Sequence, residues 1–333
     1  MDIDFVVLWV DGNDPDWQAE KRKYQGSVIN DSNAVNRFRD WGLMPYWFRA
    51  IENFAPWVRM IHFVTCGHVP PWLNLEHPKL HHVKHADYIP SEYLPTFSAN
   101  TIEMNIHRIP GLSEHFVFFN DDTFLLRPLG ERTFFQNGLP CTYGGEVPVY
   151  WHGDAGIWPH LVANDLRVVN NHFHKREQVK KFRRKYVNPA YRWQDNFRTL
   201  AVEQLFPDAF LGFKYLHAPS AFRKQTFEEL WRAEPELLHR TCMNRFRSNE
   251  DVNQWLATWW QVAEGTFEPY SVDNVVEDVT ESNIDAFCRM IISQRHDMIC
   301  VNDPSKDVDF EALSARLKDT FDRILPQKSK FEI

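Results

Sequence analysis

Four short apolar runs along the chain each end abruptly in polar residues. The runs are Ile3–Val10, Met60–Thr65, Phe116–Phe119 and Met298–Val301. Runs this short, rich in aromatic and β-branched residues, are typical of strands that are buried on both faces. The residues that follow them are Asp11, Cys66-Gly67, Asn120-Asp121-Asp122 and Asn302-Asp303. Ligands of open α/β sheets bind beyond the carboxyl ends of the strands, so the pattern predicts a mostly parallel sheet with one functional edge.

Helical patterns alternate with these strands, which favours an α/β fold. We expect helices in the second half of 36–54 and in the ranges 95–110, 175–186, 201–206, 225–233, 252–264 and 310–325. For 95–110, Ser98 or Asn100 is the expected N-cap and Pro110 the stop. For 252–264, Asn249 is the expected cap, with Glu250 and Asp251 in the first turn.

Adjacent carboxylates follow the third strand. Asp121 and Asp122 at the end of a buried strand are costly unless a positive charge lies between them. Mg²⁺ typically binds one or two carboxylates together with substrate phosphates, so the two residues are candidate metal ligands. The alternative is an ordinary turn, because Asn and Asp are common turn formers.

Two arginines, Arg37 and Arg39, precede the first helix expected after the opening strand. Guanidinium groups next to a helix N-terminus are suited to binding an anion, although surface salt bridges explain the residue types equally well. Glu103 and His107 are spaced to share one face of the 95–110 helix, where an ordinary surface pair is the simpler interpretation. The histidines at 77, 81, 82 and 85 match no metal-binding spacing.

Composition narrows the class of protein. The net charge of −8 argues against a nucleic-acid partner. Five cysteines without CxxC spacing suit a reducing cytoplasm and make a zinc site unlikely. No apolar run approaches the ~20 residues of a membrane-spanning helix. The basic stretch Lys175–Lys185 is interpreted as a solvated helix face or as a contact for an anionic lipid or polymer.

Four blocks of the chain together resemble the Stealth family of sugar-phosphate transferases. The first block is IDFVVLWVDGNDP, at residues 3–15. The second spans residues 36–128 and includes NRFRDWG, LPTFSANTIE and FFNDD. The third spans residues 217–270, with HAPSAFRK and RSNEDVNQ, and the fourth is CVND at 300–303. The family includes bacterial capsule and exopolysaccharide phosphotransferases and the enzyme that places GlcNAc-1-phosphate on lysosomal glycoproteins.

The resemblance implies a nucleotide-sugar-binding α/β fold like that of the GT-A glycosyltransferases. Residues 1–150 would form the core that binds nucleotide sugar and metal. Residues 151–216 would form a variable, mainly helical insert, and residues 217–333 would complete the catalytic core. The donor would be a UDP-sugar and the cation Mg²⁺ or Mn²⁺. The acceptor hydroxyl would attack the β-phosphorus, so that sugar-1-phosphate is transferred, a phosphodiester forms and UMP leaves.

The resemblance also assigns roles to particular residues. The residues implied in catalysis are His217, Arg247, Glu103 and Asp122, with His217 or Glu103 as the base. Those implied in donor binding are Asp11, Gly12, Arg37, Arg39 and Asn100. Those implied as metal ligands are Asp121, Asp122 and Asp303, supported by Asn302 and Asn120. The acceptor would be a polysaccharide or a lipid-linked glycan, and the location the cytoplasm, with peripheral contact to the inner face of the membrane.

Three other readings compete with this one. An ordinary glycosyltransferase on the same fold would move the sugar alone and release UDP, and the residues by themselves do not separate the two reactions. A catalytically silent sugar-binding protein would tolerate loss of Asp121-Asp122, Glu103 and Arg247, all of which are present. A metal-dependent nuclease is disfavoured by the acidic balance of the chain.

Overall fold

The computed structural model describes residues 1–25, 38–151, 153, 156–214, 217–304 and 308–333. Within these residues the strands are β1 (Ile3–Leu8), β2 (Ile61–Thr65), β3 (Leu80–Lys84), β4 (His115–Phe119), β5 (Thr123–Leu125), β6 (Phe135–Gln136), β7 (Leu139–Thr142), β8 (Ser220–Arg223), β9 (Glu268–Pro269), β10 (Asn274–Asp278) and β11 (Met298–Asn302). The α-helices are α1 (Pro15–Gln25), α2 (Met44–Phe54), α3 (His85–Tyr88), α4 (Ala99–Met104), α5 (Trp158–His172), α6 (Lys175–Tyr186), α7 (Trp193–Leu205), α8 (Lys224–Ala233), α9 (Pro235–Met243), α10 (Gln254–Glu264), α11 (Ile284–Ser293) and α12 (Phe310–Ile324).

The central sheet has the strand order β3-β2-β1-β4-β8. The first four strands are parallel and β8 is antiparallel to β4. Two smaller sheets, β10-β11-β5 and β6-β7-β9, flank it. The predicted α/β fold, with mostly parallel strands flanked by helices, is therefore confirmed.

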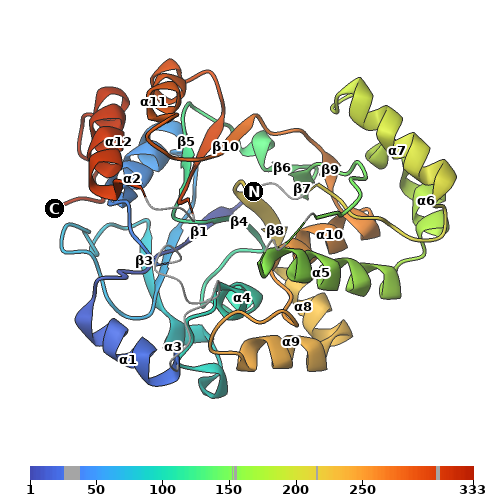
Figure 1. Cartoon of the computed structure of the whole chain (residues 1–333), viewed down its shortest axis with the longest axis horizontal. Coiled ribbons are helices and arrows are strands. Elements are labelled where there is room, and N and C mark those ends of the chain that lie inside the picture. The colour runs from blue at the N-terminus through green and yellow to red at the C-terminus, as the bar shows by residue number, and fades with distance from the viewer. Residues whose placement is uncertain (26–37, 152, 154–155, 215–216, 305–307) are drawn as a thin grey trace.

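The two middle strands bury both of their faces, which explains their continuous apolar sequence. Successive side chains of a strand point to opposite faces. In β1, Phe5 and Val7 belong to one hydrophobic cluster and Val6 to another. In β4, Phe119 belongs to the first of these clusters and Phe118 to the second. Helices α2 and α12 contribute to the first cluster, and α8, α9 and α10 to the second, so helices cover both faces (Figure 1).

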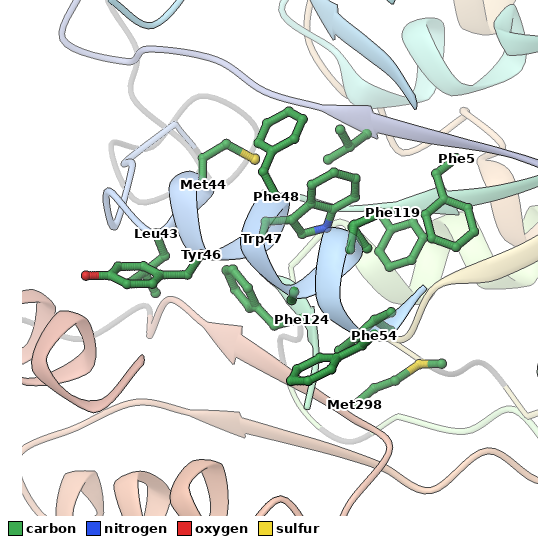
Figure 2. Packing of buried hydrophobic residues seen from close by; sticks show 14 of the residues in the cluster. Phe5, Leu43, Met44, Tyr46, Trp47, Phe48, Phe54, Phe119, Phe124 and Met298 are labelled. Atoms are coloured by element: carbon green, nitrogen blue, oxygen red, sulfur yellow. The ribbon is translucent and has the colours of Figure 1, made fainter. Parts of the chain in front are cut away.

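Helix α2 fills the first cluster. It has a proline in its first turn, where the missing N–H costs no hydrogen bond. Figure 2 shows the side chain of Trp47 directed toward Phe119, whereas Tyr46 points the other way. Trp47 is fully buried, and its ring lies edge-on to that of Phe119 at 5.3 Å. The helix therefore packs directly against the strand that leads to the acidic pair Asp121-Asp122.

One expectation about the sheet is wrong. The four apolar runs do not share one sheet, because β11 belongs to β10-β11-β5. The reason lies in β5, which follows Asp122 directly and pairs antiparallel with β11. The backbone N–H of Val301 donates to the carbonyl of Asp122 at 2.8 Å. Through this pairing the end of β11 still reaches the end of β4.

The helix expected over 95–110 is much shorter. Helix α4 ends at Met104, and a 3-10 turn, Ile106–Arg108, follows it. Asn105 explains the break, because its Nδ2 donates to the carbonyl of Thr101 at 2.8 Å and so competes with the helical ladder. Ser98 occupies the N-cap position, as predicted, but its side chain makes no cap hydrogen bond. His107 consequently does not share a helix face with Glu103, and its ring stacks on that of Phe227.

Two helix starts also differ from expectation. Helix α10 begins at Gln254, and its cap is Asn253, whose side chain accepts from the N–H of Trp255, rather than Asn249. Helix α1 is not among the helices expected from the sequence. Its signal is present in the sequence, because Pro15 stands at the first helical position and Asp14 Oδ1 accepts from the N–H of Trp17 at 2.7 Å.

The range 151–216 contains α5, α6 and α7 among its described residues. Helix α6 carries the basic stretch Lys175–Lys185, and both ends of that stretch are structural. Lys175 is buried and pairs with Glu146 at 2.6 Å. Lys185 Nζ donates to the carbonyl of Gly265 at 3.0 Å. None of the described helices is long and apolar enough to cross a membrane.

Candidate functional site

A cavity of about 650 Å³ opens at the carboxyl ends of the central strands. It gathers most of the residues singled out in the sequence, from segments far apart along the chain. These are Arg39, Asn100, Glu103, Asn120, Asp121, Asp122, His217, Arg247, Asn302 and Asp303. Asp11 and Gly12 are not part of its lining, and Arg37 lies outside the described residues.

The acidic pair lies on a turn between β4 and β5. The carbonyl of Asn120 accepts from the N–H of Thr123 at 3.3 Å, so the segment forms a turn, and the interpretation of its carboxylates as metal ligands stays a prediction. Burial raises the pKa of Asp121 to about 8, helped by the negative charges of Asp122 and Asp40. Such a cluster is stabilised by a cation among its oxygens.

One carboxylate oxygen of Asp122 is an unsatisfied hydrogen-bond acceptor. Its Oδ1 is buried and has no hydrogen-bond partner among the described residues. A buried acceptor without a donor is costly, and a divalent cation satisfies it. The donor set of Asp121 and Asp122, two hard carboxylates, fits Mg²⁺ or Mn²⁺.

His217 lies against this pair. Its Nε2 is 3.1 Å from Oδ2 of Asp122, and its backbone carbonyl accepts from Nδ2 of Asn274 at 2.9 Å. Burial lowers the pKa of His217, but the charge of Asp122 and the hydrogen bond to it outweigh burial, so that the net pKa is raised. An imidazole in this position gains stability when it accepts a proton.

Glu103 comes from α4 and meets the start of α10. Its side chain is only 5% exposed, and Oε2 accepts from the N–H of Gln254 at 3.1 Å. A carboxylate at a helix N-terminus is stabilised by the helix dipole. Burial raises the pKa of Glu103, and the positive charge of Arg247 opposes that rise. Glu103 is therefore electrostatically coupled to Arg247.

Asp251 fixes the loop that carries Arg247, whereas the sequence predicted for it only a place in the first turn of a helix. Asp251 accepts from Nδ2 of Asn100 at 3.0 Å, from Nδ2 of Asn244 at 2.7 Å and from the N–H of Ser248 at 2.8 Å. Asn100, predicted to bind the donor, thus also anchors this loop to α4. The spacing of Ser248 and Asp251 is the local signal for such a turn.

Arg39 and Asp303 form an ion pair in the cavity lining, although 264 residues separate them along the chain. Nε of Arg39 donates to Oδ2 of Asp303 at 2.8 Å, and a second bond joins Nη2 to Oδ1. The guanidinium also lies 4.2 Å from the centre of the Phe310 ring. Asp303 was predicted as a metal ligand, and here it holds Arg39 at the cavity. Asn302 Nδ2 donates to Asp278.

Asp11 and Gly12 shape the turn after β1. Oδ1 of Asp11 accepts from the N–H of Asn13 at 2.9 Å. A Cβ added to Gly12 would lie 1.9 Å from the carbonyl oxygen of Phe38, so only glycine fits here. The close approach packs Phe38 onto the turn and delivers the next residue, Arg39, to the cavity.

Several lining residues were not singled out from the sequence. Asp40 Oδ2 accepts from Nε1 of Trp9 at 3.2 Å, and burial raises the pKa of Asp40. Trp9 also lines the cavity, but one of 13 tryptophans is no signal for a site, because aromatic residues mostly serve to bury area. Cys300 does not line the cavity, and it was not singled out either, because the cysteines show no metal-binding spacing. Its ligand atom forms a group with those of Asp122 and His217.

Comparison with known protein families identifies three matching regions. Residues 1–28 match the model of Stealth protein conserved region 1, residues 37–141 that of conserved region 2, and residues 289–333 that of conserved region 4. The first two regions supply the turn after β1 and the acidic pair after β4, and the last supplies the end of β11.

Several polysaccharide phosphotransferases are similar to this chain over almost its full length. The capsular polysaccharide phosphotransferase WcwK of Streptococcus pneumoniae is 39% identical over 99% of this chain and 98% of its own length. The receptor polysaccharide phosphotransferase WefC of Streptococcus oralis is 38% identical over 99% of both chains. The exopolysaccharide phosphotransferase cps2G of Lactiplantibacillus plantarum is 36% identical over 99% of this chain and 96% of its own. With three conserved regions of the family matched and relatives similar from end to end, the chain belongs to the Stealth family.

Proposed function

We propose that this protein transfers sugar-1-phosphate, either hexose-1-phosphate or N-acetylhexosamine-1-phosphate, from a UDP-sugar to a hydroxyl of a polysaccharide. The acceptor oxygen bonds to the β-phosphorus, the bond between that phosphorus and the bridging oxygen breaks, and UMP leaves. The observation that carries the proposal is the meeting of the acidic pair Asp121-Asp122, two arginines and His217 in one cavity. Phosphoryl transfer needs this combination for positioning and charge neutralisation. The names of the relatives, all polysaccharide phosphotransferases, support it.

Asp121 and Asp122 would hold the divalent cation, Mg²⁺ or Mn²⁺. When bound, such an ion neutralises phosphate oxygens during transfer. Arg247 and Arg39 are arginines among the described residues that line the cavity, and each can present two N–H groups to a phosphate. Asp303 holds the guanidinium of Arg39 in one orientation, which reduces the entropy lost when the donor binds. Asn100, which lines the cavity, would contact the donor, and the turn at Asp11 and Gly12 would act by delivering Arg39 to the cavity.

His217 is proposed as the base. When Nε2 donates to Asp122, Nδ1 is the nitrogen that accepts the proton of the acceptor hydroxyl. The carboxylate of Asp122 then stabilises the imidazolium. Glu103 is the rival base, but its carboxylate already accepts from the N–H of Gln254 and faces Arg247. These contacts favour a positioning role for Glu103, with Arg247 as the group it orients.

The acceptor, a polysaccharide or a lipid-linked glycan, would be met at a membrane surface. Helix α7 turns Thr199 and Val202 inward but exposes Trp193 (74%) and Phe197 (68%) on its outer face. Residues 175–206 carry nine Lys or Arg and three Asp or Glu, against a net charge of −8 for the whole chain. Exposed aromatic side chains beside excess positive charge fit an anionic lipid surface. Figure 1 shows α6 and α7 at one end of the molecule.

The released nucleotide tests the proposed reaction. Purified protein is incubated with a panel of UDP-sugars, Mg²⁺ and a polysaccharide acceptor, and the nucleotide product is separated and identified. The proposal requires UMP, formed only when acceptor is present, and a phosphodiester signal in the ³¹P NMR spectrum of the polymer. Release of UDP would instead mean attack at the anomeric carbon, the reaction of an ordinary glycosyltransferase, and the role of His217 would have to be reassigned.

A further inference from the structure

Three different metal-binding side chains meet at the inner wall of the cavity. They are Asp122 after β4, His217 before β8 and Cys300 in β11, and their ligand atoms all lie within 4.8 Å of one another. Asp122 and His217 line the cavity, and Cys300 is fully buried behind them as a free thiol. An ion held by Asp122 and His217 would therefore lie next to the sulfur of Cys300 behind them.

Strand register places the thiol there. In the antiparallel pairing of β11 with β5, Cys300 lies opposite Thr123, the residue directly after Asp122. The hydrogen bond from the N–H of Val301 to the carbonyl of Asp122, 2.8 Å, fixes this register. A slip by one residue would turn Cys300 to the other face of the sheet and bring an aliphatic side chain to Asp122.

This donor set differs in kind from the pair of carboxylates beside it. Mg²⁺ takes oxygen ligands and rarely dehydrates for others. Zn²⁺ binds thiolate sulfur at ~2.3 Å, imidazole nitrogen at ~2.0 Å and carboxylate oxygen at ~2.0 Å. Two ligand atoms at those bond lengths lie roughly 3–4 Å apart around a tetrahedral ion. Atoms within 4.8 Å of one another reach that spacing by small side-chain movements.

We propose that Asp122, His217 and Cys300 form a site for a thiophilic divalent cation such as Zn²⁺, which inhibits the enzyme. On binding, the thiol of Cys300 gives its proton to solvent and its sulfur bonds to the ion, with no change of oxidation state. The ion takes Asp122 away from the Mg²⁺ site and His217 away from the acceptor. The two sites share Asp122, so they are mutually exclusive. The inhibition, but not the binding, rests on the proposed function.

Binding is tested directly with Co²⁺, whose bond to a thiolate gives a charge-transfer band in the near ultraviolet. The wild-type protein is expected to bind one equivalent with this band, and Zn²⁺ added afterwards is expected to abolish it. Cys300→Ser is expected to lose the band, because serine keeps the size and removes the sulfur. Cys66→Ser is the control, since Cys66 is exposed and its sulfur lies 3.5 Å from Nδ1 of His68.

The charge-transfer band of the variants decides whether the proposed site exists. Retention of the band in Cys300→Ser, or its loss in Cys66→Ser, overturns the proposed site. If Cys300→Ser does not fold, His217→Ala replaces it, because that side chain is one-third exposed and its removal leaves the core intact. The band is then expected to weaken or shift, and an unchanged spectrum overturns the inclusion of His217.

Inhibition is measured separately, as the Zn²⁺ concentration that halves UMP release at a fixed Mg²⁺ concentration. Cys300→Ser is expected to raise that concentration at least tenfold, and Cys288→Ser, a buried cysteine on α11, to leave it unchanged. Equal inhibition of the wild type and Cys300→Ser would overturn the inhibitory role. If no UDP-sugar gives UMP, the proposed function fails while the Co²⁺ band still decides whether the site exists.

Discussion

Nε2 of His217 lies 3.1 Å from Oδ2 of Asp122, although 95 residues separate the two along the chain. The contact joins the proposed base to the proposed metal ligand. Any change at one residue is therefore expected to alter the electrostatics of the other, and the tests below separate the two roles by measuring donor binding apart from turnover.

His217→Ala is expected to lower kcat by about 10²- to 10⁴-fold, the usual contribution of a general base, while the dissociation constant of the UDP-sugar stays within a few-fold. Rapid-quench kinetics and calorimetry measure the two quantities. His296→Ala is a matched control, because its ring contacts Asp273 at 2.9 Å and is equally exposed, at 33%, but does not line the cavity. Loss of donor binding in His217→Ala would make His217 a donor ligand.

Asp122→Asn is expected to abolish stabilisation by Mg²⁺. In the wild type, Mg²⁺ at about 100 times its dissociation constant should raise the free energy of unfolding by about 2.7 kcal/mol, and EDTA should reverse the effect. The amide of Asn carries no negative charge, so only Asp121 would remain as an anionic ligand and the stabilisation by Mg²⁺ should vanish. Thermal melts with and without Mg²⁺ measure it, and Asp273→Asn should behave as wild type. An undiminished increment in Asp122→Asn would remove that residue from the metal site.

Arg247→Lys is expected to lower kcat/KM by about 10-fold or more, because an ammonium group does not reproduce the two-pronged contact of a guanidinium with phosphate. Arg245→Lys is the control on the same loop, since Arg245 donates to the carbonyl of Glu92 and does not line the cavity. Steady-state kinetics with varied UDP-sugar measure both variants. Near-normal kinetics in Arg247→Lys would place that residue outside the reaction.

Asp4 provides a pH test of the fold rather than of the reaction. It is fully buried and accepts from Nε of Arg59 at 2.8 Å and from the N–H of Ser113 at 2.8 Å. Burial alone raises the pKa of Asp4, but hydrogen bonds from His62 and Arg59 outweigh it, so the net pKa is lowered below 3.8. The folded pKa is below the unfolded value, so the stabilisation is complete above pH 3.8 and is lost as the pH falls through the folded pKa.

Asp4→Asn should therefore destabilise the protein at about pH 7 and change its stability little at about pH 2. The expected loss is on the order of 2 kcal/mol, less than for a fully buried ion pair, because Arg59 is 37% exposed. Urea unfolding at both pH values measures it. Asp285→Asn is the control, since its ion pair with Arg316 is exposed. An equal loss at both pH values would contradict the assignment to the charge of Asp4.

Trp193→Ser combined with Phe197→Ser is expected to weaken binding to anionic vesicles at least about tenfold, since burying one large apolar side chain contributes about 1.5–3 kcal/mol. Flotation with phosphatidylserine vesicles measures it, and neutral vesicles should bind the wild type more weakly. Ile292→Ser, which removes an exposed apolar side chain of α11, should have no effect. If the double variant instead changes the oligomeric state, the outer face of α7 is a contact between copies.

Local patterns were sufficient for most of the framework. The apolar runs of β1, β2, β4 and β11 appear directly in the sequence, because strands buried on both faces require continuous apolar residues. The turn after β4 and the basic helix α6 can also be predicted from the sequence, because each depends on the types of a few neighbouring residues. The failures are also local in origin. Asn105 ended α4 early through one side-chain bond, and Asn253 rather than Asn249 capped α10, because competing polar side chains differ by little energy.

What the sequence determined by itself is the set of buried strands and the acids that follow them, because periodicity and composition act over a few residues. Tertiary structure decided which of those acids meet which partners. It moved β11 into a second sheet, joined Asp303 to Arg39, and set Cys300 behind Asp122. Those choices depend on strand register and long-range packing, and their free energies come from contacts between residues hundreds of positions apart, which no local pattern records.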